Sequence, residues 1–148
     1  MHEALKGLLE ARWIEEAHSS PEEIRGLLGI VARRIEEAQG SLKYPDTIFI
    51  LAYDAVFSAA TIVLRAHGVR AKRERHHEIT FRALRELQIP GLSDQARYYD
   101  DCRRKRNAFE YDSVADVSNA EVEDFLREAL RFTIEVRGWL ERRHPELL

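Results

Sequence analysis

The chain has 148 residues and a mass of 17.2 kDa, a length that predicts one domain able to bury a core without disulfides or metals. Apolar residues make up 45% and charged residues 33%, which favours a packed helical protein with charged outer faces. One cysteine, Cys102, excludes an internal disulfide framework, and its place in the apolar phase of a helix predicts an inert buried thiol.

The net charge of −3 hides a segregation along the chain. Between Arg65 and Arg106 there are twelve Lys or Arg and six Asp or Glu, a net of +6, and the remaining residues hold eleven and twenty, a net of −9. A basic middle on an acidic chain favours an anionic partner. Complementary helix faces within one bundle would give the same pattern, so both explanations stay open.

The sequence also gives expectations about location. The residues from Met1 to Lys6 lack a basic start followed by an apolar run, so we expect no secretory signal. The longest apolar run, Ile48 to Leu64, is interrupted by Asp54 and is expected to be too short to cross a bilayer. We therefore expect a cytoplasmic protein with no membrane partner.

Apolar spacing predicts an N-terminal helical hairpin over residues 1–40. A helical period runs from Glu3 to Ala17. The second helix begins at Ser20-Pro21-Glu22-Glu23, where Ser20 is an N-cap, Pro21 takes the first helical position and Glu23 completes a capping box.

The third helix, about Asp46 to His67, is expected to be the core of the protein. Apolar residues cover most of its circumference, and such a helix is buried nearly all round. A narrow polar line, which includes Asp54, follows one side of it, and Gly68 ends it.

The rest of the chain predicts three more helices. A basic connection, Gly68 to Arg75, leads to a helix that opens at His76-His77, and Pro90-Gly91 stops that helix. A fifth helix follows, and Ser118 with Glu121 forms a second capping box before a last helix of about Asn119 to Arg142. No useful segment alternates with period two, so the sequence predicts an all-α bundle of about five to six helices.

The stretch from Arg103 to Asp112 carries four consecutive cations, an Asn, and then an acid and a Tyr. On a helix, Arg103, Asn107 and Glu110 share one outward face. Arg106 falls in the sector that should pack against the bundle. Because a buried unpaired guanidinium costs several kcal/mol, we expect an acid to hold Arg106, either Glu110 or Asp54.

One segment resembles the signature of HEPN (higher eukaryotes and prokaryotes nucleotide-binding) domains: Arg106-Asn107-Ala108-Phe109-Glu110-Tyr111. In that signature an Arg, often followed by an Asn, precedes a His by four to six intervening residues. The order of the helices is similar too: a long buried helix with an embedded acid, a helix opening with His, and the motif helix before a long last one. The resemblance covers roughly Pro45 to Pro145 and implies a single HEPN-like domain, 1–148, with its core bundle at 45–145.

The resemblance implies a bundle that commonly dimerises and brings two copies of the motif to one cleft. Many members of the family are metal-independent RNases, including toxins of toxin–antitoxin pairs, and others bind RNA, nucleotides or protein partners without catalysis. It assigns phosphate binding to Arg106 and the orientation of groups to Asn107. The family His would move a proton, and no cofactor is implied.

Tyr111 stands where the family has this His, and no His follows before His144. A phenol, whose ordinary pKa is about 10, is a poor general base at neutral pH, although it can donate a hydrogen bond or a proton. Arg106 and Tyr111 are also about 140° apart on a continuous helix. They meet at one ligand only if the helix loosens or a second subunit completes the site. The sequence leaves catalysis by this pair open and favours binding.

Weaker signals surround the motif. The resemblance implies that His77, at the start of a helix, lies near the motif, but a capping or surface His is an equal alternative. His76 and His77 point about 100° apart on a helix, so no metal site is predicted. The basic run Arg70 to Arg75 either holds phosphates or is a solvated connection. Trp13 and Trp139 are expected to anchor the core or a dimer seam.

Three functions follow from the sequence. The first is binding of RNA or a nucleotide by a homodimer, and its residues are Arg103, Arg106, Asn107 and Tyr111, with Glu110, Asp54 and His77 beside them. The second is a protein-interaction module that holds a partner such as an antitoxin. The third is an RNase in which Tyr111 or His77 supplies the acid–base group.

Overall fold

The computed structural model describes residues 2–40, 44–111 and 117–148, with the side chains of Glu110 and Tyr111 outside the description. The described chain is 75% helical, which confirms the predicted all-α bundle. Its elements in order are η1 (Glu3–Leu5), α1 (Lys6–Glu10), β1 (Ile14–Glu16), α2 (Pro21–Gln39), α3 (Pro45–Ala66), β2 (Val69–Ala71), α4 (His76–Leu87), α5 (Ala96–Tyr111), α6 (Asn119–Arg143) and η2 (Pro145–Leu147).

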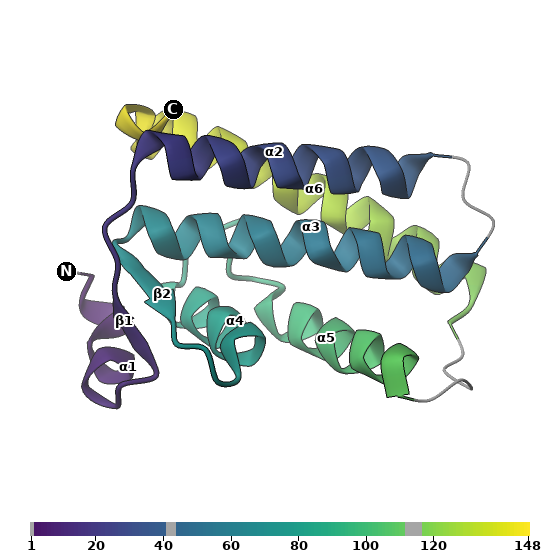
Figure 1. Ribbon diagram of the computed structural model, residues 1–148, viewed down its shortest axis with the longest axis horizontal. Coiled ribbons are helices and arrows are strands. Elements are labelled where there is room, and N and C mark those ends of the chain that lie inside the picture. Colours follow the sequence, from purple (N-terminus) through teal and green to yellow (C-terminus); the bar gives the residue numbers. More distant parts are fainter. Residues whose placement is uncertain (1, 41–43, 112–116) are drawn as a thin grey trace.

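Helix α3 is the centre of the bundle, as its apolar circumference predicts. It packs against α2, α6, α4 and α5, and Figure 1 shows it between α2 and the α4–α5 pair. Four of its buried side chains are alanines, which let the neighbouring helices approach closely: Ala52, Ala55, Ala59 and Ala60. Gly68, whose φ is 75°, turns the chain out of the helix in a conformation that suits glycine.

By length and composition α3 can cross a membrane, so the expectation that this segment is too short to cross a bilayer was wrong. The whole helix has 22 residues, because it begins at Pro45 and continues to Ala66. The core helix of a bundle passes the same test, and most of the apolar side chains of α3 are buried against other helices.

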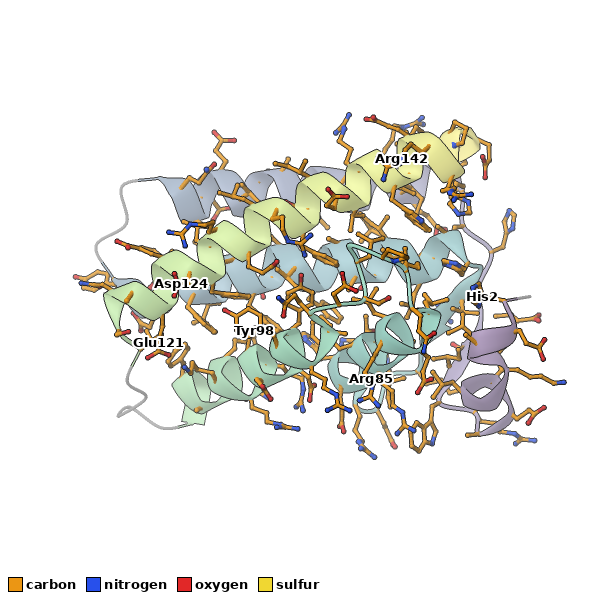
Figure 2. The ribbon with its side chains drawn as sticks, turned by 180° about the vertical axis from the view of Figure 1, so that it is seen from behind. His2, Arg85, Tyr98, Glu121, Asp124 and Arg142 are labelled. Atoms are coloured by element: carbon orange, nitrogen blue, oxygen red, sulfur yellow. The ribbon has the colours of Figure 1, made fainter. Side chains whose placement is uncertain are left out.

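The serine half of each predicted capping box is confirmed, whereas the carboxylates of Glu23 and Glu121 pair with Arg65 and Lys105. The Ser20 hydroxyl accepts a hydrogen bond from the backbone N–H of Glu23 at 3.2 Å, and α2 begins at Pro21. The Ser118 hydroxyl accepts one from the N–H of Glu121 at 3.1 Å. In Figure 2, Glu121 and Asp124 lie near the start of α6 and Arg142 near its end, so the helix spans the length of the bundle.

The predicted helix from Glu3 to Ala17 is wrong beyond Glu10, and residues 1–40 do not form a helical hairpin. Arg12 takes a left-handed backbone with φ of 62°, and Ile14–Glu16 then forms β1. This strand pairs antiparallel with Val69–Ala71, which lies in the stretch expected to be a plain connection. The pairing satisfies backbone groups and buries Ile14 to 1% exposure, and these gains override local helix propensity.

The two tryptophans lie in different environments. Trp139 is 8% exposed and packs in the core, whereas Trp13 is 37% exposed and does not anchor it. Trp13 leaves the core because the residues beyond Glu10 are not helical. Cys102 is buried, and burial raises the pKa of its thiol to about 12, which confirms an inert thiol.

Candidate functional site

The motif faces a cavity of about 240 Å³ between the start of α4 and the middle of α5. Its lining residues are Arg75, His76, His77, Glu78, Arg103, Arg106 and Asn107. Four residues predicted from the sequence therefore meet there, and they come from segments about thirty positions apart. Three guanidinium groups and one carboxylate line the cavity, and Arg75 pairs with that carboxylate, Glu78, at 2.8 Å. The cavity therefore offers guanidinium donors, which are the groups that bind phosphate and carboxylate oxygens.

Asp54 of α3 holds Arg106. The guanidinium Nη2 lies 3.8 Å from the carboxylate Oδ1 of Asp54, and the two side chains are 23% and 30% exposed. The guanidinium carbon is 5.8 Å from the centre of the Tyr53 ring, a cation–π contact. The expected ion pair with Asp54 is present, and the side chain of the other candidate, Glu110, lies outside the described residues.

Arg103 is less exposed than its predicted outward position suggests. Its side chain is 17% exposed, and its Nε donates to Asp100 at 2.7 Å. The next residue, Arg104, is 66% exposed and does not line the cavity. Arg103 is thus held in place by an acid on its own helix, as Arg106 is by an acid on α3.

His77 is held by two aromatic rings of α3. Its Nδ1 lies 2.7 Å from the hydroxyl of Tyr53, and its ring stacks on Phe57 with 3.7 Å between the centres. Tyr53 is fully buried, and burial raises its pKa, so the phenol stays protonated. His77 is the hydroxyl's hydrogen-bond partner among the described residues, so we assign the O–H as donor to Nδ1.

This assignment leaves the proton of the neutral imidazole on Nε2. The pKa of His77 is lowered to about 4, first by burial and then by the charges of His76, Arg106 and Arg103. At neutral pH the ring is uncharged and can donate a hydrogen bond through Nε2–H. Its other nitrogen already accepts from Tyr53, so the ring has no nitrogen available as a general base.

The lowered pKa of His77 makes the fold sensitive to acid. Below about pH 6.5 the unfolded chain binds a proton at this ring that the folded chain excludes until about pH 4, so stability falls as the pH drops across that window. We expect His77→Gln to flatten this part of the stability curve in urea unfolding measured from pH 7 to pH 4. His18→Gln, which changes an exposed ring, is the control. Equal slopes for wild type and His77→Gln would contradict the burial of His77.

The sequence did not mark Tyr53 or Phe57 as site residues, and it marked Arg75 only within a basic run for which a solvated connection was the alternative. Tyr53 and Phe57 are four positions apart on α3 and so share a face, but periodicity alone marks them as core. Arg75 precedes α4 in a left-handed conformation with φ of 56°, which no local residue pattern indicates. Only the packing of α3 against α4 brings these groups to the motif.

The Tyr111 side chain lies outside the described residues, so its proposed catalytic role is not tested. The backbone of α5 is helical through Tyr111, which removes one of the two ways for Arg106 and Tyr111 to meet at one ligand. No group of three His, Cys, Asp or Glu in the described ranges is arranged to hold a metal ion.

The helical bundle and the Arg-Asn motif beside a His at a helix start agree with the resemblance to HEPN domains. The family model for SAV_6107-like HEPN domains matches residues 40–137, well over half of the chain. The protein therefore belongs to the HEPN family, whose domains are generally nucleotide-binding or RNase-like. Neither the curated proteins nor the solved structures give a match to it.

Proposed function

We propose that this HEPN domain binds RNA or a nucleotide by holding a phosphate group in the cavity between α4 and α5. The observation that carries the proposal is the convergence of Arg103, Arg106 and the neutral His77 on that cavity. Guanidinium groups donate paired hydrogen bonds to phosphate oxygens, and Nε2–H of His77 adds a donor without a charge. Asp100 and Asp54 hold the two guanidinium groups, which lowers the entropy lost on binding.

The size of the cavity fits part of a nucleotide. Its volume of about 240 Å³ is below the range of about 300–1,000 Å³ that encloses drug-sized ligands. A phosphate with its sugar matches such a space, while the base would extend beyond it.

Binding is favoured over cleavage by the state of His77. Metal-independent RNA cleavage needs a base for the ribose 2′-hydroxyl, and the Tyr53 hydrogen bond occupies the nitrogen of His77 that would serve. Of the two acid–base candidates that the sequence gives, Tyr111 then remains for proton transfer. We therefore propose a binding domain and retain cleavage as an outcome to be measured.

A homodimer belongs to this proposal. The backbone of α5 is helical through Tyr111, so a site that uses both Arg106 and Tyr111 calls for a second copy of the chain. Static light scattering of the full chain is expected to give twice the monomer mass. A monomer at high concentration would remove Tyr111 from the proposed site.

The test uses two adjacent arginines. Arg103 lines the cavity and Arg104 does not, and both carry the same charge on the same helix. We expect Arg103→Gln to weaken binding of a fluorescein-labelled single-stranded RNA about ten- to hundredfold, because a hydrogen bond to a charged group contributes about 1.5–3 kcal/mol. Fluorescence anisotropy over a salt series measures the affinity, and Arg104→Gln is the matched control.

Equal losses in the two variants would show that binding follows net charge and not the cavity. No RNA or nucleotide binding by wild type, together with stable co-purification of a neighbouring protein, would support a protein-interaction module such as an antitoxin-binding domain. Cleavage products in a denaturing gel, lost in Tyr111→Phe, would support the RNase.

A further inference from the structure

A second, larger cavity adjoins the motif cavity. It measures about 780 Å³, and its lining residues are Arg12, Trp13, Glu15, Arg70, Ala71, Lys72, Arg73, Glu74, Arg75, His76 and Ile79. We call it the β-sheet groove, because β1, β2 and their flanking residues supply most of the lining. Arg75 and His76 line both cavities, so the groove and the motif cavity are neighbours on the surface.

The groove carries a surplus of positive charge. Five Arg or Lys side chains line it against two Glu. Arg70 is neutralised by Glu15 at 2.8 Å, but Arg12, Lys72 and Arg73 make no ion pair within the described part of the chain. Exposed cations without protein partners in a concave surface are suited to the phosphates of a nucleic acid strand.

Trp13 adds an aromatic surface to this groove. Its side chain is 37% exposed, and the guanidinium carbon of Arg82 lies 4.7 Å from the ring centre. The backbone N–H of Lys72 donates to the carbonyl of Trp13 at 3.1 Å, so the main chains of Trp13 and of the basic segment are held together. An exposed aromatic ring among cations can stack a base while the cations contact the strand's phosphates.

The backbone of the groove is strained at two of its arginines. Arg12 and Arg75 have φ values of 62° and 56°, in the left-handed region that residues other than glycine rarely adopt. Such conformations cluster at binding sites, where the surrounding structure holds a side chain in position. Here both residues line the same groove, where Arg75 pairs with Glu78 at 2.8 Å and Arg12 makes no ion pair within the described residues.

We propose that the β-sheet groove binds the single-stranded continuation of the RNA whose phosphate occupies the motif cavity. One base stacks on Trp13, and Arg12, Lys72 and Arg73 contact the phosphates that follow. This proposal rests on the proposed function, and it names the ligand as a strand of several nucleotides and not a free nucleotide. A duplex does not satisfy the groove, because its bases are already stacked on one another.

The experiment compares a mononucleotide, AMP, with an adenosine oligonucleotide long enough to extend beyond the motif cavity. Dissociation constants of the full chain are measured by isothermal titration calorimetry for AMP and by anisotropy for the labelled oligonucleotide. We expect Trp13→Ala to weaken oligonucleotide binding about five- to hundredfold and to leave AMP binding unchanged, since stacking on an aromatic side chain contributes only where a base reaches it. Trp13→Phe should restore much of the loss.

Tryptophan fluorescence gives a second measurement that does not depend on affinity alone. A base stacked on Trp13 should quench its emission, and the same oligonucleotide should not quench Trp13→Phe, in which only the buried Trp139 remains.

The variant with Lys72→Gln and Arg73→Gln keeps Trp13 and should lower the slope of log affinity against log salt by about 0.7 for each charge removed. Arg33→Gln, an exposed cation of α2, is the matched control.

The outcomes separate the two proposals. If Trp13→Ala binds the oligonucleotide as wild type does, without quenching in wild type, the groove proposal is overturned whatever Arg103→Gln shows. If Trp13→Ala weakens binding but Arg103→Gln does not, the groove binds RNA by itself, and both the phosphate site in the motif cavity and the continuation from it are overturned. Equal affinity for single-stranded and duplex RNA would also overturn the groove proposal. If polyglutamate competes fully for binding and Trp13→Ala has no effect, the groove proposal is overturned in favour of an acidic protein partner.

Discussion

Replacement of Arg106 by alanine is expected to raise the dissociation constant for RNA and for AMP at least about hundredfold. The Arg106 guanidinium pairs with Asp54 of α3 at 3.8 Å, and the side chain also lines the proposed phosphate site. Two hydrogen bonds from one guanidinium to a phosphate contribute about 3 kcal/mol or more in total, and about 1.4 kcal/mol is a factor of ten. Titration by calorimetry measures the change.

Arg106→Lys tests whether geometry or charge carries this effect. Lysine keeps the charge but lacks the planar fork, so we expect an affinity between those of wild type and Arg106→Ala. Thermal unfolding of each variant separates weaker binding from a loosened fold. Unchanged binding in a folded Arg106→Ala protein would contradict the phosphate site and leave the motif as an internal ion pair.

Tyr53→Ala is expected to have the largest effect on stability of the site residues. The ring is fully buried, and its centre lies 6.0 Å from that of Phe81 and 5.8 Å from that of His77. Removing a buried aromatic ring costs about 3–5 kcal/mol, a large share of the about 5–15 kcal/mol that stabilises a domain. We expect urea unfolding to show this loss, together with the loss of binding at the motif cavity.

Tyr53→Phe is the matched control, because it keeps the ring and removes the hydroxyl. The expected cost is about 1 kcal/mol, the contribution of one hydrogen bond. The pKa of His77, which the fold lowers to about 4, should rise in this variant, since the donor that favours the neutral ring is gone. NMR titration of the His77 ring measures it. A further decrease in the pKa would show that the hydroxyl accepts the hydrogen bond and that Nε2 is available as a base.

The local elements of the fold were predictable because local chemistry determines them. A serine cap and an acid three residues later start α2 and α6 wherever the rest of the chain lies. The apolar circumference of α3 required burial on all sides. The contact between Arg106 and Asp54 followed from the same logic, since a charge in the packed sector of one helix needs an opposite charge in the core helix.

The N-terminal segment was not predictable in this way. The stretch after Glu10 has a helical period, yet it forms β1 because Val69–Ala71 offers it a strand partner 55 residues further along. A strand partner so distant leaves no trace in a local period. The error affects the proposed groove, because the segment that follows β2 holds the backbone of Trp13 through the hydrogen bond from the Lys72 N–H.

The sequence by itself determined the helical bundle, its buried central helix and the charged motif, because periodicity, caps and the cost of an unpaired charge act within single elements. Only the tertiary structure decided what the motif faces. Packing of α4 and α5 against α3 sets His77 on Tyr53 and Phe57, brings its Nδ1 to the Tyr53 hydroxyl and joins it to Arg103 and Arg106. Those relations depend on distances between elements, which the spacing of residues along one element does not contain.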